Sequence, residues 1–229
     1  MRAPPNDPMT GRSLAMSRVY LFDLDGTLLD SIELILASFR HTYEVHFGET
    51  RPESYWVNAI GKTLRQQFGE LVAEMGRSPE AVDAMVETYR EHNLRHHDAM
   101  VRAYPGAVET VRALEGRGAT LAIVTSKMRV GAERGLAVMG IADAFPVCVC
   151  ADDVERGKPD PMPVHLALEK LGARAEDAVF IGDSPHDVEA GRRAGVRTAA
   201  ASWGPYPEAA LREAGPDVWL GRLEEVLGL

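Results

Sequence analysis

The sequence predicts an α/β fold, in which a parallel sheet with helices on both faces is interrupted by an inserted all-helical cap. One short apolar run, VYLF at residues 19–22, lies near the start of the 229-residue chain, and several more alternate with amphipathic segments after residue 102. Between them, residues 32–102 carry apolar side chains at helical spacing. Alternation of strands and helices is typical of parallel sheets with right-handed crossovers, so the helical stretch is expected to be an insertion.

The inserted stretch begins with SIELILASFRHTYEVHFG, where Phe39, Tyr43 and Phe47 follow one another at steps of four residues. Side chains at this spacing share one face of a helix. Two further helices are expected, from Leu64 to Met75 and from Pro79 to Leu94. The insertion is joined to the rest of the chain by two connections, which would allow the cap to move as a lid.

The other strands are predicted from five apolar runs, ATLAIV, PVCVC, DAVFIG, VRTAAA and DVWL. We therefore expect the α/β core at residues 18–31 and 103–229, the helical cap at residues 32–102, and a mobile tail at residues 1–17. In open parallel sheets, ligands bind beyond the carboxyl ends of the strands. The residues that follow each strand are thus the first candidates for function.

The composition argues against several functional classes. A net charge of −9 disfavours nucleic-acid binding, because phosphate backbones attract basic surfaces. No segment is long and apolar enough for a signal peptide or a membrane span. Cys148 and Cys150 alternate with valines and are interpreted as buried strand residues, which fits a reducing cytoplasm. Met16 is a candidate for the natural start, and the choice between monomer and homodimer stays open.

The stretch DLDGT, residues 23–27, contains the clearest sign of chemistry. Residues two apart on an extended backbone point to the same side, so Asp23 and Asp25 are expected to face one cavity. Two carboxylates this close repel each other unless a cation or a proton intervenes, and Mg²⁺ prefers such oxygen ligands. One carboxylate could act as nucleophile and the other as general acid and base. For an isolated pair of this kind, a solvated turn is the alternative interpretation.

Three other motifs support the chemical interpretation: the hydroxyl-tipped strand LAIVTS, the lysine of RGKPDP, and the acidic IGDSPHD. Together with FDLDGTLLDS, and in this order, they resemble the motifs of the haloacid dehalogenase-like superfamily of phosphohydrolases. The resemblance extends from Arg18 to the C-terminus. It implies a Rossmann-like core with an inserted helical cap.

By this resemblance, Asp23 is expected to attack phosphorus and become an aspartyl-phosphate. Asp25 is expected to protonate the leaving alcohol and later to activate water. Lys158 would hold the nucleophile and the transferring phosphoryl group by its charge. Thr125 and Ser126 would bind phosphoryl oxygens. An ordinary polar strand end and a surface lysine are the alternative interpretations of these last positions.

The resemblance also implies Mg²⁺ as the cofactor. Its ligands would be the carboxylates of Asp23 and Asp183, together with the backbone carbonyl of Asp25. Asp187 would bind the metal directly or through water. It could instead be a helix-start residue whose carboxylate accepts backbone N–H groups.

Lys62 and the histidines of the cap are further candidates. In the resembling family the equivalent cap segment often reaches the active site, so Lys62 could contact substrate, or it could be an ordinary solvated lysine. The segment around it is not a nucleotide-binding phosphate loop, because Trp56 stands where that motif needs a glycine. His92 and His96 have a spacing that suits metal binding on one helix face, but we interpret them as part of a solvated helix.

The leading prediction is a Mg²⁺-dependent phosphatase for a small phosphorylated metabolite, with 2-phosphoglycolate as the best guess. A closed cap would exclude bulky substrates and bulk water together. A sugar-phosphate mutase or other phosphotransferase of the same family is the alternative, and a phosphate-ligand-binding domain without catalysis is an alternative of another class. Dehalogenation is less favoured, because Asp25 suits proton transfer to the leaving group of a phosphate ester. Phosphonate hydrolysis is also less favoured, because it would need a cap lysine that forms a Schiff base, and Lys62 is the only lysine in the cap.

Overall fold

The computed structural model describes residues 19–57, 60 and 62–229, so the tail predicted at residues 1–17 and the predicted core start at Arg18 lie outside the described residues. A six-stranded parallel sheet with the order β5-β4-β1-β6-β7-β8 forms the centre. Its strands are β1 (Val19–Phe22), β4 (Thr120–Val124), β5 (Val147–Val149), β6 (Ala178–Gly182), β7 (Arg197–Ala201) and β8 (Val218–Leu220). Every predicted apolar run forms one of these strands, and the predicted α/β fold is confirmed.

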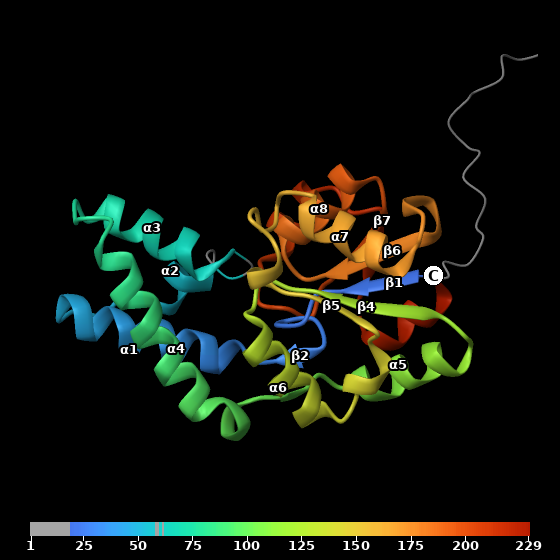
Figure 1. The fold of residues 1–229 in the computed structure, drawn as a ribbon, viewed down its shortest axis with the longest axis horizontal. Coiled ribbons are helices and arrows are strands. Elements are labelled where there is room, and N and C mark those ends of the chain that lie inside the picture. Colours follow the sequence, from blue (N-terminus) through green and yellow to red (C-terminus); the bar gives the residue numbers. More distant parts are fainter. Residues whose placement is uncertain (1–18, 58–59, 61) are drawn as a thin grey trace, which may run out of the picture.

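Helices cover both faces of the sheet (Figure 1), with α5, α6 and the C-terminal 3₁₀ segment on one face and α7 and α8 on the other. A short helix, α9, follows β7 in the chain. The bounds of these elements are α5 (Ala107–Gly116), α6 (Arg129–Met139), α7 (Met162–Leu171), α8 (Pro185–Ala194), α9 (Glu208–Glu213) and the 3₁₀ segment η4 (Leu223–Gly228). Three shorter 3₁₀ turns are η1 (Ala142–Ala144), η2 (Ala151–Asp153) and η3 (Ala175–Asp177).

The first strand lies in the middle of the sheet and is buried on both faces. Tyr20 and Phe22 pack into the apolar layer under α5 and α6, whereas Leu21 packs into the layer under α7 and α8. This explains the uninterrupted run VYLF, because a strand covered on both faces has no polar side. The backbone N–H of Asp23 donates to the carbonyl of Ile181 at 2.9 Å, which extends the pairing one residue past the strand. Asp23 therefore lies at the carboxyl edge of the sheet.

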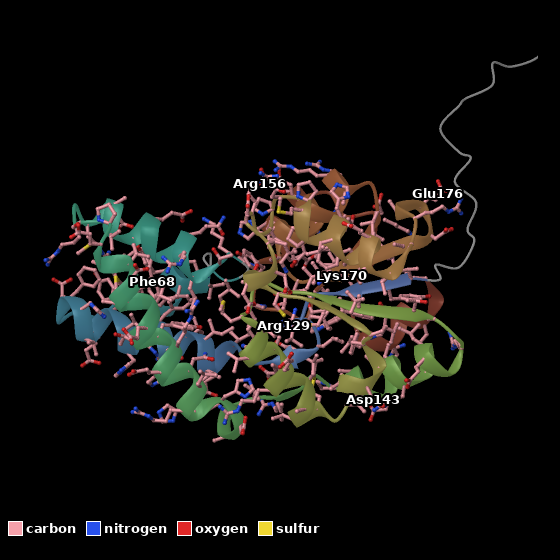
Figure 2. All side chains as sticks on the ribbon, viewed as in Figure 1. Phe68, Arg129, Asp143, Arg156, Lys170 and Glu176 are labelled. Carbon is pink, nitrogen blue, oxygen red and sulfur yellow. The ribbon has the colours of Figure 1, made fainter. Side chains whose placement is uncertain are left out.

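Helices α1 to α4, between β2 (Leu29–Asp30) and β3 (Arg102–Ala103), form a bundle to one side of the sheet, on the left of Figure 1. We call this bundle the cap. It contains α1 (Ile32–Phe47), α2 (Glu53–Val57), α3 (Leu64–Glu74) and α4 (Ala81–Met100). Its interior is aromatic: the ring of Phe39 stacks on Trp56 at 5.3 Å and meets Phe68, labelled in Figure 2, edge-on at 5.7 Å. The cap thus has an apolar interior, which continues into three residues of the core, Ala200, Tyr206 and Leu211.

Three features of the cap differ from the predicted pattern. Helix α2 was not predicted, because five residues are too few for a periodic signal. Its connections pair as a small antiparallel sheet, β2 (Leu29–Asp30) with β3 (Arg102–Ala103), and strands of two residues leave no periodic signal. The last cap helix continues past the predicted end at Leu94 to Met100, because RHHDAM contains neither glycine nor proline to stop it.

The cysteines and histidines that drew attention in the sequence take ordinary positions. Cys150 is buried and Cys148 half-buried, with unbonded sulfur atoms 3.4 Å apart. The ring of His92 lies between His41 at 4.5 Å and His96 at 4.6 Å, along the contact of α1 with α4. Within the described ranges, no helix combines the length and apolar character needed to cross a membrane.

Candidate active site

Polar side chains gather where three neighbouring strands end. Asp23 follows β1, Thr125 follows β4, and Asp183 follows β6. Strands β4 and β6 are the neighbours of β1 in the sheet. All three side chains are buried. Because parallel strands place their carboxyl ends at one edge, residues far apart in the sequence meet here.

A fully buried lysine links two carboxylates at this edge. The ammonium of Lys158 donates to Asp23 Oδ1 at 2.8 Å and to Asp187 Oδ1 at 2.5 Å, and it lies 3.3 Å from the carbonyl of Val124. Burial alone would lower the pKa of Lys158, but the charges of Asp187 and Asp23 outweigh that effect and raise it. Lys158 is therefore a permanent cation beside Asp23 and not a surface lysine.

Asp187 is the third residue of helix α8 and caps its first turn together with Ser184. Its Oδ2 accepts from the backbone N–H of Ser184 at 3.0 Å and from the Ser184 hydroxyl at 2.6 Å, while its own N–H points back to that hydroxyl. This reciprocal capping fixes the carboxylate without any metal. The helix-start interpretation thus holds for one oxygen, and the other oxygen is bound to Lys158.

Asp183 has one oxygen without a partner. The hydroxyl of Thr27 donates to its Oδ1 at 2.8 Å, whereas its buried Oδ2 has no hydrogen-bond partner among the described residues. Two glycines leave it space: a Cβ on Gly26 would lie 2.5 Å from that Oδ2, and one on Gly204 would lie 2.3 Å from Asp183 Cβ. Gly26 also has a φ of +86°, which side chains rarely adopt. Gly204 is therefore required for close packing around this carboxylate.

The three carboxylates fit a divalent cation. One oxygen each from Asp23, Asp183 and Asp187 lie within 4.8 Å of one another. Burial raises the pKa of Asp23 to about 7. The positive charge of Lys158 acts in the opposite direction and lowers this pKa, whereas the negative charges of Asp187 and Asp25 raise it further. Burial, followed by the charges of its two neighbours, raises the pKa of Asp183 well above its ordinary value. A single lysine does not balance this charge, and the free oxygen of Asp183 is a ligand of the hard type that Mg²⁺ takes.

The side chain of Asp25 has different partners and stands outside this carboxylate group. Its Oδ1 accepts from the ammonium of Lys127 at 2.9 Å and from the hydroxyl of Ser31 at 2.5 Å. We had predicted that a metal would offset the repulsion within DLDGT. The structure adds a second lysine for that purpose, so each of the two aspartates has its own ammonium group.

A cavity of about 690 Å³ lies between this edge of the sheet and the cap. Its core wall includes Asp23, Asp25, Thr125, Ser126 and Lys127, and its cap wall includes residues of α1, α3 and α4. The hydroxyl oxygen of Thr125 accepts from the backbone N–H of Lys127 at 3.1 Å, which fixes the loop after β4. Both carboxylates of DLDGT thus line one cavity.

Lys62 lies on the cap wall of the same cavity. Its ammonium is bound by both oxygens of Glu70, at 2.9 and 2.8 Å. This lysine therefore reaches the cavity, as the first of the two interpretations requires, but its charge is already compensated by a cap carboxylate.

Three residues of the site carried no assigned role in the sequence. Thr27 and Ser31 lie inside the motif FDLDGTLLDS but act on carboxylates through hydroxyls that no spacing rule identifies. Lys127 directly follows Thr125-Ser126. Lysine is rare in this chain, with only four residues, and a lysine next to a candidate strand end was the signal that could have identified it.

The chain is similar to known proteins of one family. Residues 20–201 match the family model described as haloacid dehalogenase-like hydrolase. The chain is 41% identical over 209 residues to the pyrophosphatase PpaX of Halalkalibacterium halodurans, which covers 91% of this chain and 94% of that protein.

Solved structures show the same fold. A hydrolase from Pseudomonas syringae superposes with a TM-score of 0.84 at 27% identity, covering 92% of this chain and 96% of the other. A protein from Haemophilus somnus, described as a predicted phosphoglycolate phosphatase, gives a TM-score of 0.83 with coverage of 94% and 98%. At 22% identity, the second likeness shows the fold alone.

Proposed function

Because the chain belongs to the haloacid dehalogenase-like hydrolase family, whose named relatives here are phosphatases, we propose that it is a Mg²⁺-dependent phosphohydrolase that works through an aspartyl-phosphate. One observation carries the proposal. The Asp23 carboxylate lies on the wall of the cavity between the sheet edge and the cap, with one oxygen bound to the buried Lys158 ammonium. Its other oxygen accepts no hydrogen bond within the described part of the chain, so it is available to attack phosphorus.

The groups around Asp23 suit the binding of a phosphoryl group. Lys158 is a preorganised cation beside the attacking oxygen and offsets the negative charge that develops during transfer. The hydroxyl of Thr125 and the neighbouring Ser126 lie on the same wall and would donate to phosphoryl oxygens. These groups orient the phosphorus toward Asp23.

Asp25 is placed for proton transfer. It lies on the cavity wall two residues from the nucleophile, and Ser31 and Lys127 fix the position of its carboxyl group. In our proposal it gives a proton to the leaving oxygen and then takes one from the water that attacks the aspartyl-phosphate. A side chain that serves both steps must stay in one place through the cycle, and these two contacts provide that.

Mg²⁺ would be held by the carboxylates of Asp23 and Asp183 and by the backbone carbonyl of Asp25, with Asp187 bound directly or through water. When bound, such an ion would offset the negative charge of the phosphoryl oxygens and of the carboxylates that bind the ion. The unpartnered buried oxygen of Asp183 is the observation that supports this assignment.

The substrate is proposed to be small, because the cap covers the cavity. The named relative at 41% identity is a pyrophosphatase, which favours inorganic pyrophosphate as the first candidate. The second candidate is 2-phosphoglycolate, which the sequence resemblance suggested. Both are compact, and both carry a second anionic group beyond the phosphoryl group that is transferred.

The test is phosphate release with and without Mg²⁺ from a panel of pyrophosphate, 2-phosphoglycolate, hexose phosphates and nucleoside monophosphates. We expect metal-dependent release that Asp23→Asn abolishes, and the preferred compound identifies the substrate. Release that survives in Asp23→Asn would remove the proposed nucleophile. Conversion of one hexose phosphate into another would identify a mutase, and binding of phosphate without any turnover would identify a non-catalytic domain.

A further inference from the structure

The cations on the cavity wall differ in how their charges are balanced. Three of the four among the described lining residues have a carboxylate partner, and Arg90 has none. The partnered pairs are Lys62 with Glu70 at 2.8 Å, Arg65 with Asp83 at 2.6 Å, and Lys127 with Asp25 at 2.9 Å. Among the described residues, no carboxylate balances the charge of Arg90.

Arg90 belongs to α4 and is only partly exposed. Its Nε is buried, and no hydrogen bond or ion pair reaches this side chain from the described residues. A buried donor without a partner destabilises the protein, so a bound group that accepts from it removes that cost. A guanidinium is suited to anions with two oxygens, such as a phosphoryl or carboxylate group.

Gln67 of α3 lines the same cavity and has a complementary defect. Its Nε2 donates to the carbonyl of Lys62 at 2.8 Å, which fixes the orientation of the amide because a carbonyl only accepts. The opposite atom, Oε1, is buried and has no partner among the described residues. The cap wall therefore presents one unmet donor on Arg90 and one unmet acceptor on Gln67.

We propose that Arg90 and Gln67 form a distal subsite on the cap that binds the second anionic group of the substrate while the first group reacts at Asp23. This inference rests on the proposed function and names the substrate class, a compact molecule with two anionic groups. Pyrophosphate fits both atoms, since its non-reacting phosphoryl group offers oxygens to Arg90 and, when it keeps one proton, a hydroxyl to Gln67. The cap thereby recognises the end of the substrate that the core does not hold.

The experiment compares substrates with and without a second anionic group. Steady-state kinetics are measured with pyrophosphate, with 2-phosphoglycolate, and with 2-hydroxyethyl phosphate, in which a neutral hydroxymethyl group replaces the carboxylate. Arg90→Gln is expected to lower kcat/KM roughly 10- to 100-fold for the first two, as loss of a hydrogen bond to a charged group would. For 2-hydroxyethyl phosphate the change should stay within about two-fold, because no charged contact is lost.

Two further variants serve as controls. Arg65→Gln removes a guanidinium from the same wall, but one that Asp83 already compensates, so it should leave all three substrates unchanged. Arg90→Lys keeps the charge and should retain part of the preference. An equal loss of kcat/KM with all three substrates in Arg90→Gln would show a structural role for Arg90, and no loss with pyrophosphate would show that the subsite does not exist.

A binding measurement separates this inference from the catalytic one. Imidodiphosphate, which has two phosphoryl groups and resists hydrolysis, and orthophosphate, which has one, are titrated into the wild type and Arg90→Gln by calorimetry. Weaker binding of imidodiphosphate alone supports the subsite even if the wild type turns over no substrate. Equal binding in both proteins overturns the subsite even if phosphate release is normal.

Discussion

Replacing the Lys158 ammonium by an apolar group is predicted to destabilise the protein strongly. In Lys158→Met the side chain keeps most of its volume, but Asp23 and Asp187 lose the cation that lies 2.8 and 2.5 Å from them. Removing one partner of a buried ion pair costs about 3–5 kcal/mol, because the remaining buried charge is left uncompensated. This loss is large beside the roughly 5–15 kcal/mol that stabilises a typical native protein.

The assay is urea unfolding followed by circular dichroism near neutral pH, first in EDTA and then in saturating Mg²⁺. In EDTA the unfolding midpoint should fall while the slope stays constant, since the surface exposed on unfolding is unchanged. Mg²⁺ should recover part of the loss, because a divalent cation on the same carboxylates replaces some of the missing positive charge.

The matched control is Lys170→Met, which removes the same ammonium from an exposed position near the end of α7. That change should alter the free energy of unfolding by no more than about 0.5 kcal/mol. If the two variants unfold at the same urea concentration in EDTA, the charge balance argued for this site is wrong. A loss in Lys158→Met that Mg²⁺ deepens would contradict the assignment of the metal to these carboxylates.

Three other changes give separate tests. Lys127→Met should lower kcat roughly 10- to 100-fold, because Asp25, the proposed proton donor and acceptor, loses the ammonium that fixes its position. The melting temperature should change little. Steady-state kinetics measure the first effect and calorimetry the second. Gly204→Ala should weaken Mg²⁺ binding in a titration and lower the free energy of unfolding by about 1–3 kcal/mol, because the new methyl group would press on Asp183. Gly69→Ala, a control in α3 with open space around it, should raise the free energy of unfolding by about 0.5–1 kcal/mol, and urea unfolding measures both changes. Burial lowers the pKa of His97 below its unfolded value of 6.5, so the folded state binds its proton more weakly and stability falls as pH drops below about 6.5. His97→Gln should flatten that fall in acid unfolding curves, and the exposed His165→Gln should not.

The sheet and the cap were accessible from the sequence because their signals are local. An apolar run of four or five residues predicts a buried strand without reference to any other part of the chain, and a four-residue period predicts a helix in the same way. The β2–β3 pair was not accessible, because it depends on two connections that lie about seventy residues apart meeting in space. The end of α4 was placed too early for the opposite reason, since nothing local stops that helix.

The candidate site was predictable as far as motifs reach. Asp23, Thr125, Lys158 and Asp183 follow strand ends or recognisable turns, so the expected fold already brings them to one edge. The partners of Asp25 and the uncompensated state of Arg90 depend instead on which charges meet after folding. Arg90 is one of many arginines in the sequence, and only the cavity distinguishes it.

The use of lysine in this chain ties these observations together. Arginine greatly outnumbers lysine, of which there are four. Even so, Lys62 and Lys127 line the cavity, and Lys158 is bound to Asp23, the proposed nucleophile. An ammonium is a compact point charge that can lie between two carboxylates, whereas a guanidinium is a planar fork that binds one anion through two nitrogens. Lysine therefore suits the positions that balance the crowded aspartates of the core. Arginine suits the position on the cap that remains open to a substrate anion.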